Sequence, residues 1–236
     1  MNLPDWRTYL RESRSFYYSL FLILPLMVVY EVGTIWLFSN QPYELRNAAD
    51  ALLRFILEQI GAQPGYYFSI IFVAVLLITM GSGVWREERQ PLNSIVFPMM
   101  LVESFLWGIA LYVVLQQLAQ LVLGVTASHT WLVQVNLALG AGLYEEMIFR
   151  VILIAALTFI FHRGFRWNRN SSGWFGLVGA AAIFAGFHLF METFVWPVFI
   201  QRFVGGVLLG ILYLKRGYGI TAYSHIFYNL TILFLP

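Results

Sequence analysis

Residues 16–38 read FYYSLFLILPLMVVYEVGTIWLF, an apolar run that contains a single charged side chain, Glu31. About 20 apolar residues in a helix cross the hydrocarbon core of a bilayer, so this run predicts a membrane-spanning helix. The whole chain has the same character, because 60% of its 236 residues are hydrophobic and only 11% are charged. A soluble domain carries about 25% charged residues. The composition therefore excludes a soluble enzyme and a disordered chain, and a net charge of +2 argues against a nucleic-acid partner.

Six more apolar runs are long enough, or nearly so, to span the membrane. We therefore expect an all-α fold, a polytopic transmembrane helical bundle with about seven spans and short interfacial helices. The expected spans are residues 16–38, 66–84, 94–123, 131–161, 173–191, 194–214 and 219–235. Residues 44–63 predict an amphipathic surface helix between the first two spans. Without a repeat or a second folding unit, we expect one membrane domain, with residues 1–125 as its N-terminal part and residues 126–236 as its core.

Lys and Arg residues are distributed unevenly between the two sides of this expected topology. Ten of the 14 lie on the side of the N-terminus, two lie on the other side, and Arg150 and Arg202 lie inside spans. Positive residues concentrate in cytoplasmic loops, so we expect a cytoplasmic N-terminus and an external C-terminus. The compact length and short loops favour a bacterial inner membrane. The chain has no cysteine, which excludes disulfides and a thiol nucleophile.

The densest polar cluster inside an expected span is Tyr144-Glu145-Glu146-Met147-Ile148-Phe149-Arg150. Charges at membrane depth are costly and usually functional. Glu146 and Arg150 stand four residues apart on one helix face and can form an ion pair. Glu145 lies about 100° round the helix and is left for another role, for which a general base is the chemical candidate. The alternative is that all three charges form a structural ion network.

Two later spans contribute further polar groups. His188 follows Phe184 by four residues and His225 precedes Asn229 by four, so each pair shares a helix face. Either histidine alone is as readily a hydrogen-bonded core residue. Together with Glu145, they place groups suited to catalysis on three helices, which predicts one polar pocket.

Three more charged residues, Glu31, Glu103 and Arg202, are expected inside the membrane. We expect them to pair with one another or with Arg150, because an unpaired charge is costly at that depth. The alternative is that Glu31 or Glu103 lines a substrate groove.

The familiar intramembrane proteases leave distinct residue patterns, and most of these are missing from the sequence. An aspartyl protease needs two membrane-embedded aspartates, whereas Asp5 and Asp50 both lie outside the expected spans. A rhomboid-like serine protease needs a G-x-S-G motif, and the nearest stretch, Met80-Gly81-Ser82-Gly83, lacks the first glycine. No H-E-x-x-H zinc motif occurs. A glutamate with histidines on separate helices is the set that is left.

Three motifs in this order resemble the CPBP family, which comprises CAAX proteases and bacteriocin-processing enzymes and is also called Abi. They are Glu145-Glu146-x3-Arg150, Phe184-x3-His188 and His225-x3-Asn229. The resemblance covers residues 130–236. It implies an endopeptidase that hydrolyses a peptide bond of a membrane-associated protein or peptide.

The resemblance also implies a role for each motif residue. Glu145 would activate a water molecule, and His188 would help to hold that water. His225 and Asn229 would stabilise the oxyanion, which suits the N–H groups that an imidazole and a carboxamide can donate. Glu146 is the fifth residue of the expected catalytic set and would shape the site, and Arg150 and Phe184 would support it.

Two histidines and one carboxylate are also a known catalytic zinc set, so a metal held by Glu145, His188 and His225 is the alternative mechanism. We expect no cofactor, because these residues lie on separate helices and no pair of histidines four residues apart fixes a metal. The expected partners are the lipid bilayer and a membrane-associated substrate. Within such a family, that substrate can be a prenylated CAAX tail, a bacteriocin leader or a C-terminal sorting helix.

Two other functions fit the embedded charges. Buried Glu, His and Arg also serve as relay groups in a proton-coupled transporter. The same fold can also serve a non-catalytic immunity or scaffold protein. The intact motifs and the lack of an internal repeat favour the protease over both.

Overall fold

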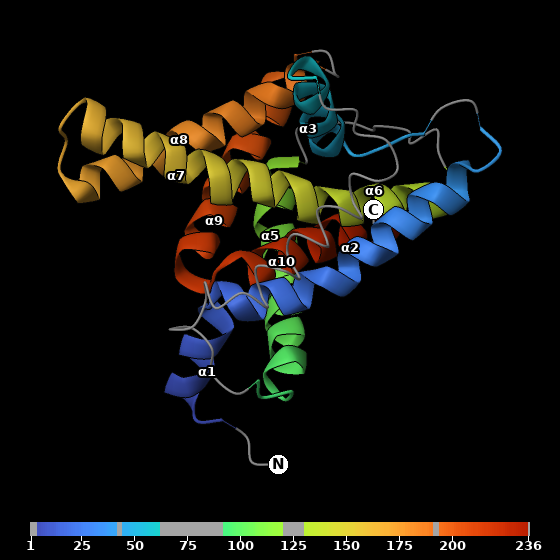
Figure 1. The fold of residues 1–236 in the computed structure, drawn as a ribbon, viewed down its shortest axis with the longest axis horizontal. Coiled ribbons are helices and arrows are strands. Elements are labelled where there is room, and N and C mark those ends of the chain that lie inside the picture. The colour runs from blue at the N-terminus through green and yellow to red at the C-terminus, as the bar shows by residue number, and fades with distance from the viewer. Residues whose placement is uncertain (1–3, 42–43, 62–91, 120–129, 191–193, 236) are drawn as a thin grey trace.

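The computed structural model describes residues 4–41, 44–61, 92–119, 130–190 and 194–235. Within these ranges the chain is helical and contains no strand, as expected for an all-α fold (Figure 1). The elements in chain order are α1 (Trp6–Arg14), α2 (Phe16–Phe38), α3 (Ala48–Gln59), α5 (Val96–Ala119), α6 (Trp131–Gly140), η1 (Ala141–Glu145), η2 (Met147–Leu153), α7 (Ile154–Phe159), η3 (Ile160–Gly164), α8 (Arg169–Phe187), η4 (His188–Phe190), α9 (Trp196–Arg216) and α10 (Tyr218–Phe234).

Three of the described helices are long and apolar enough to cross a membrane, namely α2, α5 and α9. They fit an integral membrane protein. The expected count of seven spans is not confirmed, because α8 and α10 are not among these three helices. The expected span at residues 66–84 lies outside the described residues.

Residues 131–164 form one unbroken helical run from α6 to η3, in place of the simple span expected at residues 131–161. Figure 1 shows this run lying across α5 and α9 rather than alongside them. Because the run crosses other helices, a residue in its middle can contact a residue in the first half of a neighbouring helix. Much of the run is π-helical, and π turns are rare and often occur at functional sites.

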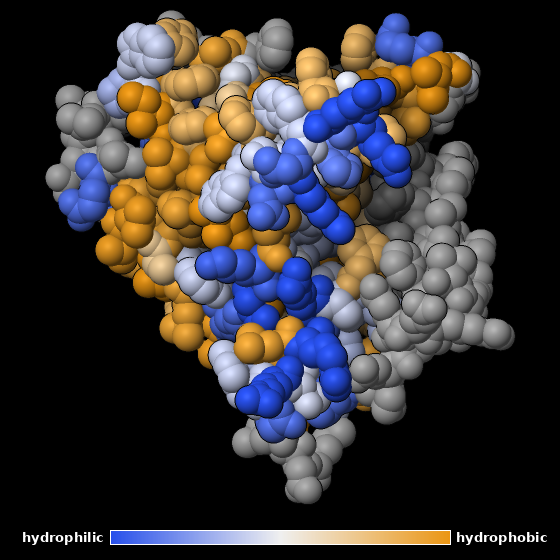
Figure 2. Space-filling view, turned by 90° about the vertical axis from the view of Figure 1, so that its left-hand side faces the viewer, coloured by the Kyte–Doolittle hydropathy of each residue, from blue (hydrophilic) through white to orange (hydrophobic). Residues whose placement is uncertain are grey.

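The main core cluster joins α2, α3, η1 and α10. Tyr30 of α2, Tyr144 of η1 and Ile226 of α10 are all buried in it. The exposed turn at residues 162–170 lies at the far end of the α7–α8 hairpin. Figure 2 faces that end of the molecule and shows hydrophilic residues beside an extended hydrophobic surface, as expected for a protein that meets both lipid and water.

The helix α3 lies within the expected amphipathic segment, but its charged face is turned inward. Asp50 and Arg54 are buried against the protein, whereas Phe55, Ile56 and Ile60 are exposed. Of the expected apolar side, Ile56 and Ile60 point away from the protein, which suits contact with lipid, whereas Ala49 and Leu53 pack against the main core cluster. The sequence pattern located the helix and did not show which face packs.

A network of ion pairs fixes this inward face. Arg46 Nη1 lies 2.9 Å from Asp50 and 3.1 Å from Glu31, and Arg54 Nε lies 2.7 Å from Asp50. Tyr30 donates its hydroxyl hydrogen bond to Asp50 over 3.0 Å. Burial by itself lowers the pKa of Arg46, but the charges of Glu31 and Asp50 outweigh burial and raise that pKa above its ordinary value. Arg46 is therefore a permanent cation in this network.

The expectation that Glu31, Glu103 and Arg202 pair with one another or with Arg150 is wrong for both glutamates. Glu31 pairs with Arg46, and Glu103 lies 2.6 Å from Arg216 Nε at the end of α9. Arg46 and Arg216 had been expected in the segments that connect the spans, outside the membrane. Only the packing of α3 and α9 brings them to the glutamates.

Candidate active site

Close packing of η1 against α10 sets the position of the two adjacent glutamates. A Cβ atom on Gly142 would lie 2.5 Å from the Ala222 carbonyl oxygen of α10 and would also overlap Ile226. Only glycine allows this approach without a shift of the backbone. Glu145 and Glu146 follow Gly142 by three and four residues, about one helical turn, so they are held near α10, and both are buried.

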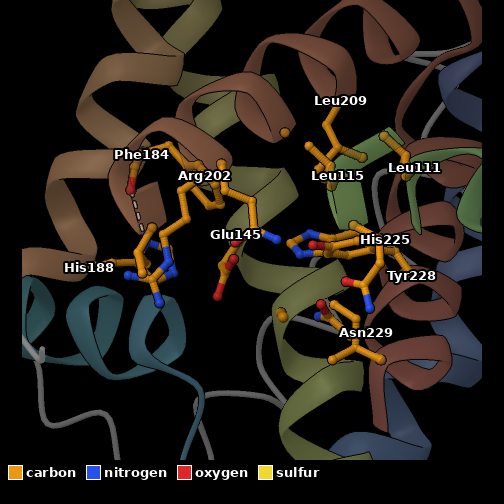
Figure 3. A pocket seen from close by; sticks show the side chains of 16 residues that line it. Leu111, Leu115, Glu145, Phe184, His188, Arg202, Leu209, His225, Tyr228 and Asn229 are labelled. Atoms are coloured by element: carbon orange, nitrogen blue, oxygen red, sulfur yellow. Dashed lines mark hydrogen bonds between the residues drawn. The ribbon is translucent and has the colours of Figure 1, made fainter. Parts of the chain in front are cut away.

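A cavity of about 470 Å³ lies beside Glu145. Figure 3 shows the Glu145 carboxylate between His188 on one side and His225 with Asn229 on the other. These four of the five expected catalytic residues line this cavity although they come from η1, η4 and α10, whereas Glu146 does not line it. The expected single pocket is therefore present, and the crossing of the 131–164 run explains how Glu145 meets a residue near the start of α10.

The rest of the cavity wall has two kinds of residue. The apolar part comes mainly from α5, α9 and α10 and includes Leu111, Leu115, Val198, Leu209 and Ile232. The polar part includes Gln116, Gln201, Arg202 and Tyr228. Arg202 was expected to serve in an ion pair, and its place in this wall had no signal in the sequence.

Glu145 is 5% exposed, and one of its oxygens has a partner that the sequence did not predict. Asn47 Nδ2 donates a hydrogen bond of 2.9 Å to Glu145 Oε1. Asn47 immediately precedes α3 and lies far from Glu145 along the chain. Its sequence context predicts only a helix cap.

Glu146 forms the expected ion pair and one contact that was not expected. Arg150 Nε lies 3.1 Å from Glu146 Oε2, as the spacing of four residues predicted. Glu146 Oε1 lies 2.7 Å from His225 Nδ1. Neither Glu146 nor Arg150 lines the cavity, so both act from behind His225.

The hydrogen bonds of the two histidines define what each ring offers to the cavity. His225 Nδ1 faces a carboxylate and His188 Nδ1 lies 2.9 Å from the Phe184 carbonyl oxygen, so each Nδ1 carries the proton. In its neutral form each ring then keeps a lone pair on Nε2. Only a protonated imidazole can donate from Nε2.

Phe184 links the two sides of the site. The Arg150 guanidinium carbon stands 4.3 Å from the centroid of the Phe184 ring, a cation–π contact. The same ring meets the His188 ring edge-to-face at a centroid separation of 5.0 Å. Arg150 Nη1 and Nη2 are buried and form no hydrogen bond with a described residue. The aromatic face therefore supplies part of the stabilisation of this cation.

The metal alternative requires Glu145, His188 and His225 to converge on one point. The Nδ1 contacts of both histidines suit metal ligands, because ligating imidazoles usually donate their other nitrogen to an acceptor. Among the described residues, no three His, Asp or Glu side chains come together as a group that could hold a metal ion.

Residues 127–231 match the family model described as type II CAAX prenyl endopeptidase Rce1-like. The match covers less than half of the chain and includes all three motifs. This part of the chain is thus similar to the CPBP/CAAX protease family, as the three motifs had indicated. Neither the curated proteins nor the solved structures gave a match. The family match favours neither the transporter nor the scaffold.

Proposed function

We propose that this protein is an intramembrane endopeptidase in which Glu145 activates the attacking water. The observation that carries the proposal is the single cavity lined by Glu145, His188, His225 and Asn229. A buried carboxylate with one oxygen held by an amide is a suitable general base. The cavity is apolar on its other walls, which suits a membrane-embedded peptide.

The proposed reaction uses these four side chains in sequence. Glu145 takes a proton from water while His188 Nε2 accepts the other hydrogen of that water. The hydroxide attacks the carbonyl carbon, and the charge that develops on its oxygen meets Asn229 Nδ2 and the His225 imidazolium. Glu145 then returns its proton to the leaving nitrogen, and the C–N bond breaks.

Glu146 and Arg150 fix the position of His225 in the proposed reaction. The Glu146 carboxylate lies 2.7 Å from His225 Nδ1 and holds the ring through that nitrogen. Arg150 holds Glu146 in place from the opposite side. Their contribution to catalysis is to keep an N–H group on His225 directed at the substrate oxygen.

The mechanism is proposed to need no metal, because Glu145, His188 and His225 come from three separate helical elements. Purified protein should keep its activity after treatment with a chelator. A stoichiometric metal that is lost together with activity in His188→Ala would overturn this part of the proposal.

The test of the function compares wild-type protein with Glu145→Gln in lipid vesicles. The probes are one peptide ending in a CAAX sequence with a farnesylated cysteine and the same peptide without the lipid. Glu145→Gln should lower the rate about 10²–10⁴-fold, the usual contribution of a general base. Mass spectrometry of membrane peptides from cells with each form then identifies the natural substrate. Equal peptide sets in the two cells, together with equal cleavage of the probes, would refute the proposal.

We further propose seven spans in a bacterial inner membrane, with a cytoplasmic N-terminus and an external C-terminus. The uneven distribution of Lys and Arg supports this orientation. Figure 1 places α1 and α3 at opposite ends of the molecule, which agrees with their expected location on opposite sides.

Because the chain has no cysteine, single cysteines can report this topology. The exposed positions Arg7 and Gln59 lie in α1 and α3. A membrane-impermeant maleimide should label Gln59→Cys in intact cells and Arg7→Cys only after lysis. The reverse result would invert the topology.

A further inference from the structure

The segment at residues 44–59, here called the strap, brings one side chain to the candidate active site from outside the family match. Asn47 of the strap is buried and is the N-cap of α3. Its Nδ2 donates to Glu145 Oε1 over 2.9 Å. Asn47 does not line the cavity, so it acts on the carboxylate without touching a substrate.

The amide of Asn47 has only one orientation that satisfies its neighbours. Its Oδ1 accepts a hydrogen bond of 2.9 Å from the backbone N–H of Ala49, in the first turn of α3. With Oδ1 engaged in the helix cap, Nδ2 is the end that faces Glu145. The cap thus selects a donor rather than an acceptor for the Glu145 carboxylate.

The backbone of Asn47 is held as firmly as its side chain. Its N–H donates to the Tyr30 hydroxyl oxygen over 3.2 Å, and that hydroxyl donates to Asp50. On the other side, a Cβ atom on Gly140 would lie 2.7 Å from Asn47 Cβ. The glycine allows the strap to lie directly on the helical run that carries Glu145.

We propose that Asn47 is a positioning residue of the hydrolytic site, and that the strap is therefore part of the catalytic unit. This inference rests on the proposed role of Glu145 as the base. By binding Oε1, the amide fixes the plane of the carboxylate and directs Oε2 to the water. The ion pairs of Arg46 and Arg54 with Asp50 keep the strap, and hence the amide, in register.

A positioning role predicts a specific kinetic pattern. Loss of the amide donor should lower kcat and leave KM unchanged, because Asn47 does not line the cavity. Loss of one hydrogen bond to the charged general base should lower kcat about 10- to 100-fold.

Two substitutions at Asn47 separate positioning from helix capping. Asn47→Ser keeps a side-chain oxygen for the cap of α3 and is too short to reach Glu145. Asn47→Asp also keeps the cap, but it replaces the donor with a second carboxylate. Its kcat should fall further than that of Asn47→Ser, because a second carboxylate in place of the donor repels the Glu145 carboxylate.

The chain provides a matched control for both variants. Asn168 is an exposed N-cap of α8, and its Oδ1 accepts from the Ser171 backbone N–H over 2.8 Å. Asn168→Ser and Asn168→Asp repeat the same capping changes away from the site. They should leave kcat and KM as in the wild type.

A second readout does not depend on hydrolysis. In protein labelled with ¹³C at glutamate carboxyl groups, the infrared band that disappears in Glu145→Gln belongs to Glu145. That band should shift in Asn47→Ser and not in Asn168→Ser, with thermal unfolding confirming that both are folded. An unshifted band in folded Asn47→Ser overturns the inference, as does an unchanged kcat. If the band shifts in Asn47→Ser but the wild-type protein has no peptidase activity, the Asn47 contact is supported and the proposed function is refuted.

Discussion

Two groups of buried charges face the same helical run and are built differently. In the strap network, Asp50 binds Arg46, Arg54 and the Tyr30 hydroxyl at once, so its carboxylate is saturated. In the site, Glu145 has one amide partner and is otherwise directed to a cavity. The comparison teaches that a structural ion network occupies its donors and acceptors, whereas a hydrolytic site keeps some available for a substrate.

The largest effect on stability is expected in the strap network. Asp50→Ala leaves Arg46 and Arg54 without their shared buried carboxylate and should lower the free energy of unfolding by about 3–5 kcal/mol. Thermal unfolding in detergent measures this, with Glu58→Ala on the exposed side of α3 as the control. If Glu145→Gln lowered the stability as much as Asp50→Ala, the contrast between the two charge groups would fail.

The contact of η1 with α10 tests whether the site depends on helix packing. Gly142→Ala introduces a Cβ atom 2.5 Å from the Ala222 carbonyl oxygen and should cost about 1–3 kcal/mol of stability. Activity should fall by more than this cost explains, because Glu145 and His225 are moved apart. Gly173 in α8 has open space around it, so Gly173→Ala should be neutral or stabilising. Equal activity in the two variants would contradict the prediction.

The Glu146–His225 contact predicts a loss of rate when its charge is removed. Glu146→Gln weakens the contact that holds His225 Nδ1, so kcat should fall about tenfold. The control Glu58→Gln should keep the wild-type kcat. A wild-type kcat in folded Glu146→Gln would mean that Glu146 does not act on the reaction through His225.

The smallest effect is expected at the N-cap of α1, remote from both charge groups. The backbone N–H and then the hydroxyl of Thr8 donate to Asp5 and hold its pKa below the ordinary value. The cap therefore stabilises α1 at neutral pH, and this contribution is lost as the pH falls through the lowered pKa. Asp5→Ala should speed amide hydrogen exchange in α1 at neutral pH, relative to wild type, and do so less at acid pH. The same ratio at both pH values would count against a charged cap.

The local spacings in the sequence predicted a large part of the site. The four-residue spacing gave the Glu146–Arg150 pair and the shared cavity of His225 and Asn229, because one helical turn fixes both. The apolar runs located every described helix of the C-terminal part to within a few residues. The number of spans could not be predicted from the sequence, since length and hydropathy alone do not separate a short span from an interfacial helix.

What the sequence determined by itself is the membrane setting, the helical class and the protease motifs, because each depends on composition or on contacts within one helical turn. Only the tertiary structure decided that Asn47 reaches Glu145, that Glu146 holds His225 and that Arg216 pairs with Glu103. Each of these contacts joins segments far apart in the chain. Their existence depends on which helix faces pack and at what crossing, and the close approaches at Gly140 and Gly142 settle that in three dimensions.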